Sequence, residues 1–303
     1  MSATFLLEAG LFTATLIATG RLTTQILHDA LDRLDAAGCA PSGVGWLDDG
    51  DAADIHFDEA ADAARAALEG AFERVDIVVQ PMAGREKRLL VADMDSTMIT
   101  VECIDELADY AGIKPEIAAI TEAAMRGELD FAAALDARVA LLKGLGADAI
   151  ERCRAERVTL MPGAETLVKT MRARGATAIL VSGGFTAFAE PVGATIGFNR
   201  VIANHLEVGD GRLRGRVAKP IVDSSTKERT LREACAELGL ADTATLAVGD
   251  GANDLAMINI AGLGVAYHAK PIVAEAAAAR VDHGDLTALL WAQGIARKDW
   301  VTE

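Results

Sequence analysis

The sequence predicts an α/β protein in which helices cover both faces of a parallel sheet, preceded by a smaller α+β domain. Three observations support this prediction. After residue 87, short apolar runs alternate with helical patterns; the clearest runs are followed by aspartate, serine or glycine; and the charge of the chain changes near residue 80. Continuously apolar runs are typical of strands that are buried on both faces of a sheet.

The first domain is predicted at residues 1–82 and the second at residues 83–303. Residues 1–80 carry 14 acidic and 4 basic side chains, whereas the whole chain of 303 residues carries 45 and 29, a net charge of −16. The first domain is expected to have strands at 3–7, 43–47, 53–57 and 74–79, and helices at 23–37 and 58–72. This βαββαβ order predicts a ferredoxin-like sandwich.

The second domain begins with a pattern of apolar strands and polar strand ends. The clearest strands are expected at 89–92, 178–181 and 246–248. They are followed by Asp-Met-Asp at 93–95, Ser-Gly-Gly at 182–184 and Gly-Asp-Gly at 249–251. In open parallel sheets, ligands bind beyond the carboxyl ends of the strands. We therefore expect these three clusters to form one site.

The connection between the first two of these strands is too long for a simple crossover. About 85 residues separate Ala92 from Ala178, although a crossover needs only about a dozen. Most of the additional residues show the apolar spacing of helices. This spacing predicts a helical insertion at 102–157 that caps the site, followed by a crossover helix at 163–174. Alternating residues on both sides of a Gly-Asp-Gly turn predict a β-hairpin at 201–217.

The clusters at the strand ends contain carboxylates that suit a metal ion. Asp93 and Asp95 are both expected to face the crevice. Paired carboxylates at a buried strand end are costly unless a cation balances their charge. Asp250 supplies a third carboxylate, and Mg²⁺ prefers oxygen ligands of this kind. For each motif alone, a helix cap or a plain turn is the alternative.

Two further features suit an anionic group such as a phosphate. Ser182 and Gly183 offer a hydroxyl and backbone N–H groups to an anion. Lys227 lies just inside a helix that is expected to begin after residues 223–225, and its ammonium group could balance phosphate charge. The alternative is an ordinary solvated lysine.

These motifs occur in the order found in the haloacid dehalogenase-like phosphohydrolases, and in detail the chain resembles the phosphoserine phosphatases of that superfamily. The matching segments are 93–97, 102–106, 125–128, 138–142, 181–185, 249–254 and 267–271. The resemblance covers residues 87–296. It implies a Rossmann-like parallel sheet with a helical cap. It also implies an enzyme that hydrolyses the small molecule O-phosphoserine through an aspartyl-phosphate intermediate, the last step of serine biosynthesis.

The resemblance implies a role for each matching residue of the core. Asp93 would be the nucleophile, and Asp95 would be the general acid and then the general base. Mg²⁺ would be held by Asp93, by the backbone carbonyl of Asp95 and by Asp250. The groups that position the phosphoryl group would be Ser182, Gly183, Lys227 and Asn253. Asp254 would orient Lys227 or a metal-bound water, and Thr97 completes the first motif.

The resemblance also implies that the cap selects the substrate. Glu102 would pair with the ammonium group of the substrate and Arg138 with its carboxylate. One fixed anion and one bidentate guanidinium suit a zwitterion on chemical grounds alone. Met125 and Phe131 would close the site and exclude water. Taken alone, Glu102 is typical of an acidic residue at a helix N-terminus, and Arg138 is typical of an arginine on the surface.

Other functions stay open at this point. One is a related phosphatase for phosphohomoserine, a phosphosugar or another small phosphomonoester. Another is a non-catalytic sensor whose N-terminal segment binds an amino acid. That segment resembles an ACT-like regulatory domain in its element order, so serine feedback and a homodimer formed through it are hypotheses.

The composition excludes some partners. A strongly negative chain is repelled by nucleic acids and by anionic membrane surfaces. The most apolar N-terminal stretch, residues 5–18, is broken by Glu8 and is too short to span a bilayer. Because no leader segment is recognised either, a cytoplasmic location is expected.

Overall fold

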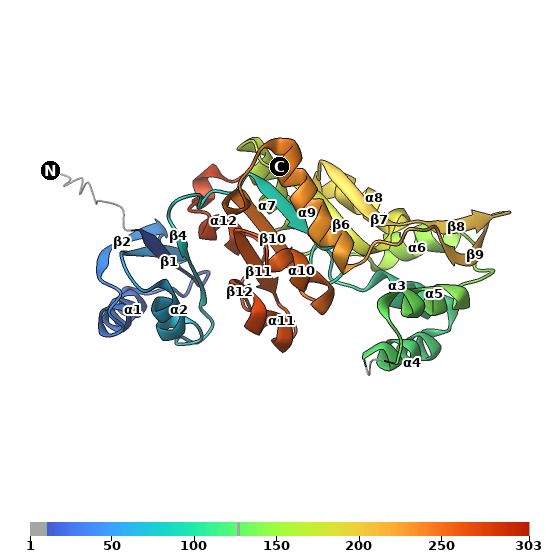
Figure 1. Cartoon of the computed structure of the whole chain (residues 1–303), viewed down its shortest axis with the longest axis horizontal. Helices are drawn as coiled ribbons and strands as arrows, with labels where there is room; N and C mark the ends of the chain where they lie inside the picture. The colour runs from blue at the N-terminus through green and yellow to red at the C-terminus, as the bar shows by residue number, and fades with distance from the viewer. Residues whose placement is uncertain (1–10, 126–127, 303) are drawn as a thin grey trace.

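The structure, a computed structural model, describes residues 11–125 and 128–302. It contains a four-stranded antiparallel sheet, a six-stranded parallel sheet and a two-stranded hairpin. In Figure 1 the antiparallel sheet forms one end of the molecule, the parallel sheet forms its middle, and helices α3, α4 and α5 lie at the other end. The predicted fold class is confirmed.

The antiparallel sheet belongs to the N-terminal segment. Its strands are β1 (Phe12–Ile17), β2 (Pro41–Asp48), β3 (Ala52–Phe57) and β4 (Asp76–Pro81), and its helices are α1 (Thr24–Ala36) and α2 (Ala61–Leu68). The strand order β2-β3-β1-β4 with antiparallel neighbours is the ferredoxin-like arrangement that was predicted. The strand predicted at 3–7 lies outside the described residues, and strand β1 at 12–17 was not predicted.

The parallel sheet holds the three predicted strands at its centre. Its strands are β5 (Leu89–Ala92), β6 (Thr177–Phe185), β7 (Arg200–Asn204), β10 (Thr245–Gly249), β11 (Leu263–Tyr267) and β12 (Ala279–Val281). The order β12-β11-β10-β5-β6-β7 is parallel throughout. Strand β5 lies between β10 and β6, so the chain leaves β5 in one direction and later returns on its other side. Ligand crevices form at such switch points.

Helices cover both faces of the parallel sheet. One face packs on α7 (Ala164–Ala173), α8 (Thr186–Ile196) and α12 (Ala288–Ala292). The other packs on α9 (Ser224–Leu238), α10 (Leu255–Ile258) and α11 (Pro271–Ala276). Alternate residues of β5 serve the two faces, since Leu90 belongs to the first cluster and Leu89 to the second. This double burial explains why the strand sequence is apolar at every position.

The insertion after β5 is helical, as predicted. It consists of α3 (Cys103–Ala111), α4 (Lys114–Met125), α5 (Phe131–Leu141) and α6 (Asp148–Arg157). The hairpin of β8 (Leu206–Gly209) and β9 (Arg212–Val217) packs against α5. It is shorter than the predicted hairpin, because residues 200–204 form β7 and pair with β6 instead.

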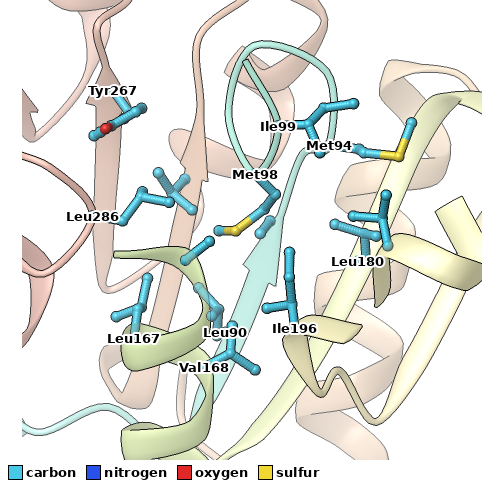
Figure 2. Close-up of a cluster of buried hydrophobic side chains, with 14 of the residues drawn as sticks. Leu90, Met94, Met98, Ile99, Leu167, Val168, Leu180, Ile196, Tyr267 and Leu286 are labelled. Atoms are coloured by element: carbon cyan, nitrogen blue, oxygen red, sulfur yellow. The ribbon is translucent and has the colours of Figure 1, made fainter. Parts of the chain in front are cut away.

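The turn after β5 is anchored in the core by methionines. Figure 2 shows Met94 and Met98 among the side chains around Leu90, Leu180 and Ile196, and Met94 and Met98 are fully buried. The carbonyl oxygen of Met94 accepts hydrogen bonds from the N–H groups of Thr97, Met98 and Ile99. The aspartates on either side of Met94 are therefore held by packing as well as by hydrogen bonds.

A buried ion pair joins the antiparallel sheet to the rest of the molecule. The guanidinium of Arg85 contacts both carboxylate oxygens of Asp54 at 2.6 and 2.7 Å. It also donates to Thr15 Oγ1 and to the carbonyl oxygen of Ala292 at 2.8 Å each. Arg85 and Asp54 are 8% and 5% exposed.

Within residues 11–125 and 128–302, no helix has the length and apolar character needed to cross a membrane.

We expect the replacement Arg85→Met to lower the free energy of unfolding by about 3–5 kcal/mol, because it leaves the buried Asp54 carboxylate with the Thr15 hydroxyl but without a balancing cation. Denaturant unfolding measures the change. The control is Arg174→Met, which removes an exposed pair with Glu86 and is expected to cost less than about 1 kcal/mol. Equal losses in the two variants would contradict the importance of the buried pair.

Candidate active site

A cavity of about 520 Å³ lies between the carboxyl ends of the parallel strands and the helical insertion. Most of the residues that the sequence singled out lie in its wall. They are Asp93, Asp95, Glu102, Phe131, Arg138, Ser182, Gly183, Asp250 and Asn253. Lys227 and Asp254 contact this group from behind the wall, and Thr97 bonds to Asp250. Met125 ends α4, and its side chain lies outside the described part of the chain.

Three buried charges form the floor of the site. The Nζ atom of Lys227 lies 2.7 Å from Asp93 Oδ1 and 2.5 Å from Asp254 Oδ1. Lys227 is 1% exposed and Asp254 is fully buried. Burial alone would lower the pKa of Lys227, but the charges of Asp93 and Asp254 more than offset this and raise it. Lys227 therefore stays protonated in spite of its burial.

The chain begins α9 so that Lys227 points to this floor. Asp223 is the N-cap residue, and its Oδ1 accepts a hydrogen bond from the N–H of Thr226 at 2.9 Å. Lys227 is in the first turn of the helix, as predicted. The other oxygen of Asp254 accepts from the N–H of Gly251 at 3.0 Å, and a Cβ at Gly249 would collide with the Asp254 side chain. The glycine thus makes room for the carboxylate that holds the lysine.

A set of carboxylates in the site could hold a metal ion. Oxygen atoms of Asp93, Asp250 and Asp254 lie within 4.8 Å of one another. Burial and the nearby charge of Asp93 raise the pKa of Asp250 to about 6 and that of Asp254 to about 7. Carboxylates that resist ionisation because they crowd together fit a divalent cation, which would neutralise them. Thr97 Oγ1 donates to Asp250 Oδ1 at 3.2 Å and orients it.

Asp95 differs from Asp93 in its surroundings. Burial, and next the charge of Glu102, raise the pKa of Asp95 to about 8. Its Oδ1 accepts a hydrogen bond from the N–H of Cys103 at 3.2 Å, at the start of α3. A carboxyl group that keeps its proton near neutral pH can act as an acid. Asp95 is thus suited to donate a proton, whereas Asp93 is paired with the ammonium group of Lys227.

The C-terminal end of β6, which runs four residues beyond the strand predicted at 178–181, contributes a hydroxyl and close backbone. Ser182 is 1% exposed, and its Oγ accepts from the N–H of Gly184 at 2.9 Å. A Cβ at Gly184 would lie 2.9 Å from Asp95 Oδ2, so a larger residue would push into the Asp95 carboxyl group. The buried Asn204 donates to the carbonyl oxygen of Gly183 at 2.8 Å and accepts from the N–H of Val222 at 2.8 Å. Asn204 therefore connects the C-terminal end of β6 to the segment that leads into α9.

The helical insertion lines the cavity with the acids Glu102 and Asp105, the guanidinium of Arg138 and the ring of Phe131. Glu102 Oε1 accepts from Ser96 Oγ at 2.9 Å. Arg138 Nε donates to the carbonyl oxygen of Ala134 at 3.3 Å, which fixes its stem on α5. A Cβ at Gly183 would lie 3.2 Å from the Phe131 ring, so the ring lies directly over the C-terminal end of β6.

The sequence predicted no role for some residues in and around the site. Asn204 has no local motif, because its partners at 183 and 222 are far from it in sequence. Asp105 and Lys270 line the cavity, and both lie within matching segments that gave them no function. A test of every charged residue in those segments would have found them.

The fold and the acidic cavity are those of a hydrolase with a Rossmann-like core and an inserted cap. A sequence profile described as "haloacid dehalogenase-like hydrolase" matches residues 90–259, more than half of the chain. The chain belongs to the haloacid dehalogenase-like hydrolase family, as the motifs predicted.

The relatives that match this chain include phosphoserine phosphatases. A phosphoserine phosphatase of Streptomyces coelicolor is 48% identical over 77% of this chain, and one of Polaromonas is 45% identical over 71%. The matches cover 57% and 94% of those two proteins, so the chain spans little more than half of the Streptomyces relative. The unliganded structure of a probable phosphoserine phosphatase from Vibrio cholerae is 31% identical. It matches 99% of this chain and 93% of its own with a TM-score of 0.76.

The raised pKa of Asp95 predicts how the stability of the metal-free protein changes with pH. The folded form binds the proton of Asp95 up to about pH 8, whereas an unfolded aspartate releases it near about pH 4. The stabilisation is therefore complete below about pH 4 and is lost as the pH rises through about 8. We expect the melting temperature to fall between about pH 5 and about pH 9.

The matched control for this measurement is Asp95→Asn, which has no proton to lose at this position but can still accept from Cys103. Its melting temperature should fall less over the same range. Identical slopes for the two proteins would contradict the raised pKa of Asp95.

Proposed function

We propose that the protein is a phosphoserine phosphatase, which hydrolyses O-phosphoserine to serine and phosphate in the last step of serine biosynthesis. The observation that carries the proposal is the cavity in which Asp93, Asp95 and Lys227 meet below Glu102 and Arg138. The first group suits phosphoryl transfer, and the second suits the ammonium and carboxylate of an amino acid. The names of the relatives support the same substrate.

Asp93 acts as the nucleophile in this mechanism. Its Oδ1 accepts from the N–H of Met94 at 2.8 Å and contacts Lys227. In the described part of the chain, no hydrogen bond reaches Oδ2, so Oδ2 is the oxygen that attacks. A bond forms between Oδ2 and phosphorus, and the bond from phosphorus to the seryl oxygen breaks. The products of this first half of the reaction are an aspartyl-phosphate and serine.

Asp95 moves the proton in both halves of the reaction. It gives its proton to the seryl oxygen as that group leaves, and burial and the charge of Glu102, which raise its pKa in the metal-free protein, favour the protonated form. As a carboxylate it then takes a proton from water, and this water attacks phosphorus to release phosphate and restore Asp93. Glu102 lies close enough to raise the pKa of Asp95, so the cap supports its acid role.

Mg²⁺ is the proposed cofactor. Asp93, Asp250 and the backbone carbonyl of Asp95 would hold it, and when bound it supplies positive charge that neutralises the oxygens of the transferred phosphoryl group. Asp254 remains engaged by Lys227 and Gly251, so its role is to orient the lysine. Lys227, Ser182, the N–H of Gly183 and Asn253 hold the phosphoryl oxygens.

The cap selects the amino acid. Glu102 pairs with the ammonium group and Arg138 with the carboxylate of phosphoserine, and Phe131 excludes water above the C-terminal end of β6. Burial lowers the pKa of Arg138, while the charges of Asp105 and Glu102 oppose that shift. A guanidinium in this setting keeps its charge, and because Nε donates to Ala134, the edge formed by its two Nη groups is the one that can bind a carboxylate.

The remaining parts of the proposal concern the whole chain. We propose that residues 1–82 and 83–303 are separate domains and that residues 102–157 are the cap of the second. A homodimer formed through the first domain, and a cytoplasmic location, stay predictions. The analytical ultracentrifugation mass of the full chain tests the dimer.

The replacement Asp93→Asn tests the function. We expect wild-type protein to release phosphate from O-phosphoserine with Mg²⁺ and to lose this activity in a chelator. Asp93→Asn should lower kcat by at least about 10⁴-fold because it removes the nucleophile, with the circular dichroism spectrum unchanged. The exposed Asp210 serves as control, since Asp210→Asn should leave the activity intact.

The outcomes separate the alternatives. Turnover of another phosphomonoester in preference to phosphoserine would replace the proposed substrate. An Asp93→Asn variant as active as the wild type would overturn the nucleophile. A wild type without any turnover would favour the sensor.

The replacement Arg138→Met tests substrate selection. We expect it to raise KM for phosphoserine about 10- to 100-fold through the lost charged hydrogen bonds. It should leave KM for O-phosphoethanolamine, which lacks the carboxylate, nearly unchanged. The control is Arg152→Met on the exposed face of α6. An equal rise for both substrates would show that Arg138 does not read the carboxylate.

A further inference from the structure

One cation in the wall of the active-site cavity has no part in the mechanism above. Lys270 lines the cavity from the loop that follows β11. Among the described residues of the wall, the acids are Asp93, Asp95, Glu102, Asp105 and Asp250, and the cations are Arg138 and Lys270. Arg138 belongs to the cap and Lys270 to the core, where the buried Lys227 below the wall is a further cation. An anionic substrate entering this cavity therefore meets an excess of acids on that side.

The charge of Lys270 already acts on two of these acids. Burial raises the pKa of Glu102 and that of Asp250, and the ammonium of Lys270 opposes both shifts. Glu102 lies on the cap and Asp250 on the loop after β10. The charge of Lys270 therefore acts on both the cap and the core side of the cavity that it lines.

The backbone of Lys270 is fixed to the metal-binding loop. Its N–H donates to the carbonyl oxygen of Asp250 at 3.3 Å. Its carbonyl oxygen accepts from the N–H groups of Val273 and Ala274 at 2.9 and 3.1 Å, and Pro271 begins α11 directly after it. The side chain thus starts from a defined point, although its end is free to move toward a ligand.

His268 holds this loop from the opposite side. Its backbone has a φ of +43°, which a residue with a side chain rarely adopts. Its N–H donates to the carbonyl oxygen of Val281 at 2.8 Å, and its Nε2 lies 2.9 Å from the carbonyl oxygen of Gly284. Because a carbonyl oxygen only accepts, the proton of the neutral imidazole is on Nε2.

The N-terminal sheet holds the residues that His268 contacts. The buried carboxylate of Asp76 in β4 accepts hydrogen bonds from the N–H groups of residues 282, 283 and 284 at 2.6–3.2 Å. The chain of contacts therefore runs from Asp76 to Gly284, then to His268 and to Lys270 at the cavity. Each step is a hydrogen bond or a short stretch of backbone.

We propose that Lys270 is a substrate-binding residue, which pairs with an anionic oxygen of the substrate, and that His268 is a positioning residue that holds Lys270 in place. This inference rests on the proposed function. The anionic oxygen belongs either to the carboxylate or to the phosphoryl group. The geometry favours a role in binding rather than in the chemical step, because Lys227 already occupies the floor beside Asp93.

The test compares Lys270→Gln with Lys270→Arg, which keeps the charge. We expect Lys270→Gln to raise KM for phosphoserine about tenfold with kcat within about twofold of wild type. Lys270→Arg should restore most of the binding. The control is Lys298→Gln, an equal change of charge at an exposed lysine far along the chain, and its KM should match the wild type.

A second substrate identifies the oxygen. If KM rises for phosphoserine but not for O-phosphoethanolamine, Lys270 binds the carboxylate; if it rises for both, Lys270 binds the phosphoryl group. An unchanged KM for both substrates in Lys270→Gln overturns the inference while the phosphatase activity stands. A wild type that hydrolyses neither substrate overturns the proposed function and the inference with it.

The positioning role is tested in a double-mutant cycle. His268→Ala should raise KM in the wild-type background but hardly at all in Lys270→Gln, because His268 acts through Lys270. His268→Gln, whose amide can still donate to Gly284, should restore KM. Thermal melting of all variants measures general destabilisation. Equal increases of KM in both backgrounds would overturn the positioning role.

Discussion

The active site depends on one buried lysine held between two buried carboxylates. Removing Lys227 from water is costly, and its contacts with Asp93 and Asp254 make that burial tolerable. The three residues come from the end of β5, the first turn of α9 and the loop after β10. Because each charge is satisfied only when all three elements are in place, the ionic contact fixes their relative positions. The shape of the cavity follows from this constraint.

The same constraint explains the chemistry of the neighbouring acids. Lys227 pairs with Asp93 and Asp254, but the site stays buried and acidic, so the pKa values of Asp95, Asp250 and Asp254 all rise. A raised pKa makes Asp95 an acid near neutral pH, whereas the crowding around Asp250 favours a divalent cation. One arrangement of charge thus produces an acid and a cation site side by side. The methionine anchors around Leu90 hold the turn that carries Asp93 and Asp95.

The sequence predicted most of what depends on neighbouring residues. The apolar strands, their polar ends and the helical insertion are visible because periodicity and turn residues are local signals. The contacts that position the site are not local. Residues 200–204 became β7 because Val201 lies beside Leu180 in the sheet, and Asn204 acts on residues far from it in sequence. The apolar N-terminal stretch contained β1 at 12–17, but its composition did not reveal where pairing with β3 and β4 begins.

The contact between the two sheets follows the same physical logic as the active site. Arg85 with Asp54, and Asp76 with residues 282–284, are buried charges satisfied only across the junction. Their desolvation is offset only when the antiparallel sheet is docked. Asp54 and Asp76 of the antiparallel sheet are therefore buried in this molecule, whereas water would reach them if the sheet and its two helices stood alone. Since Asp76 also holds the segment that contacts His268, the N-terminal sheet supports the wall of the cavity, and the acidic excess of the N-terminal segment includes side chains that hold the molecule together.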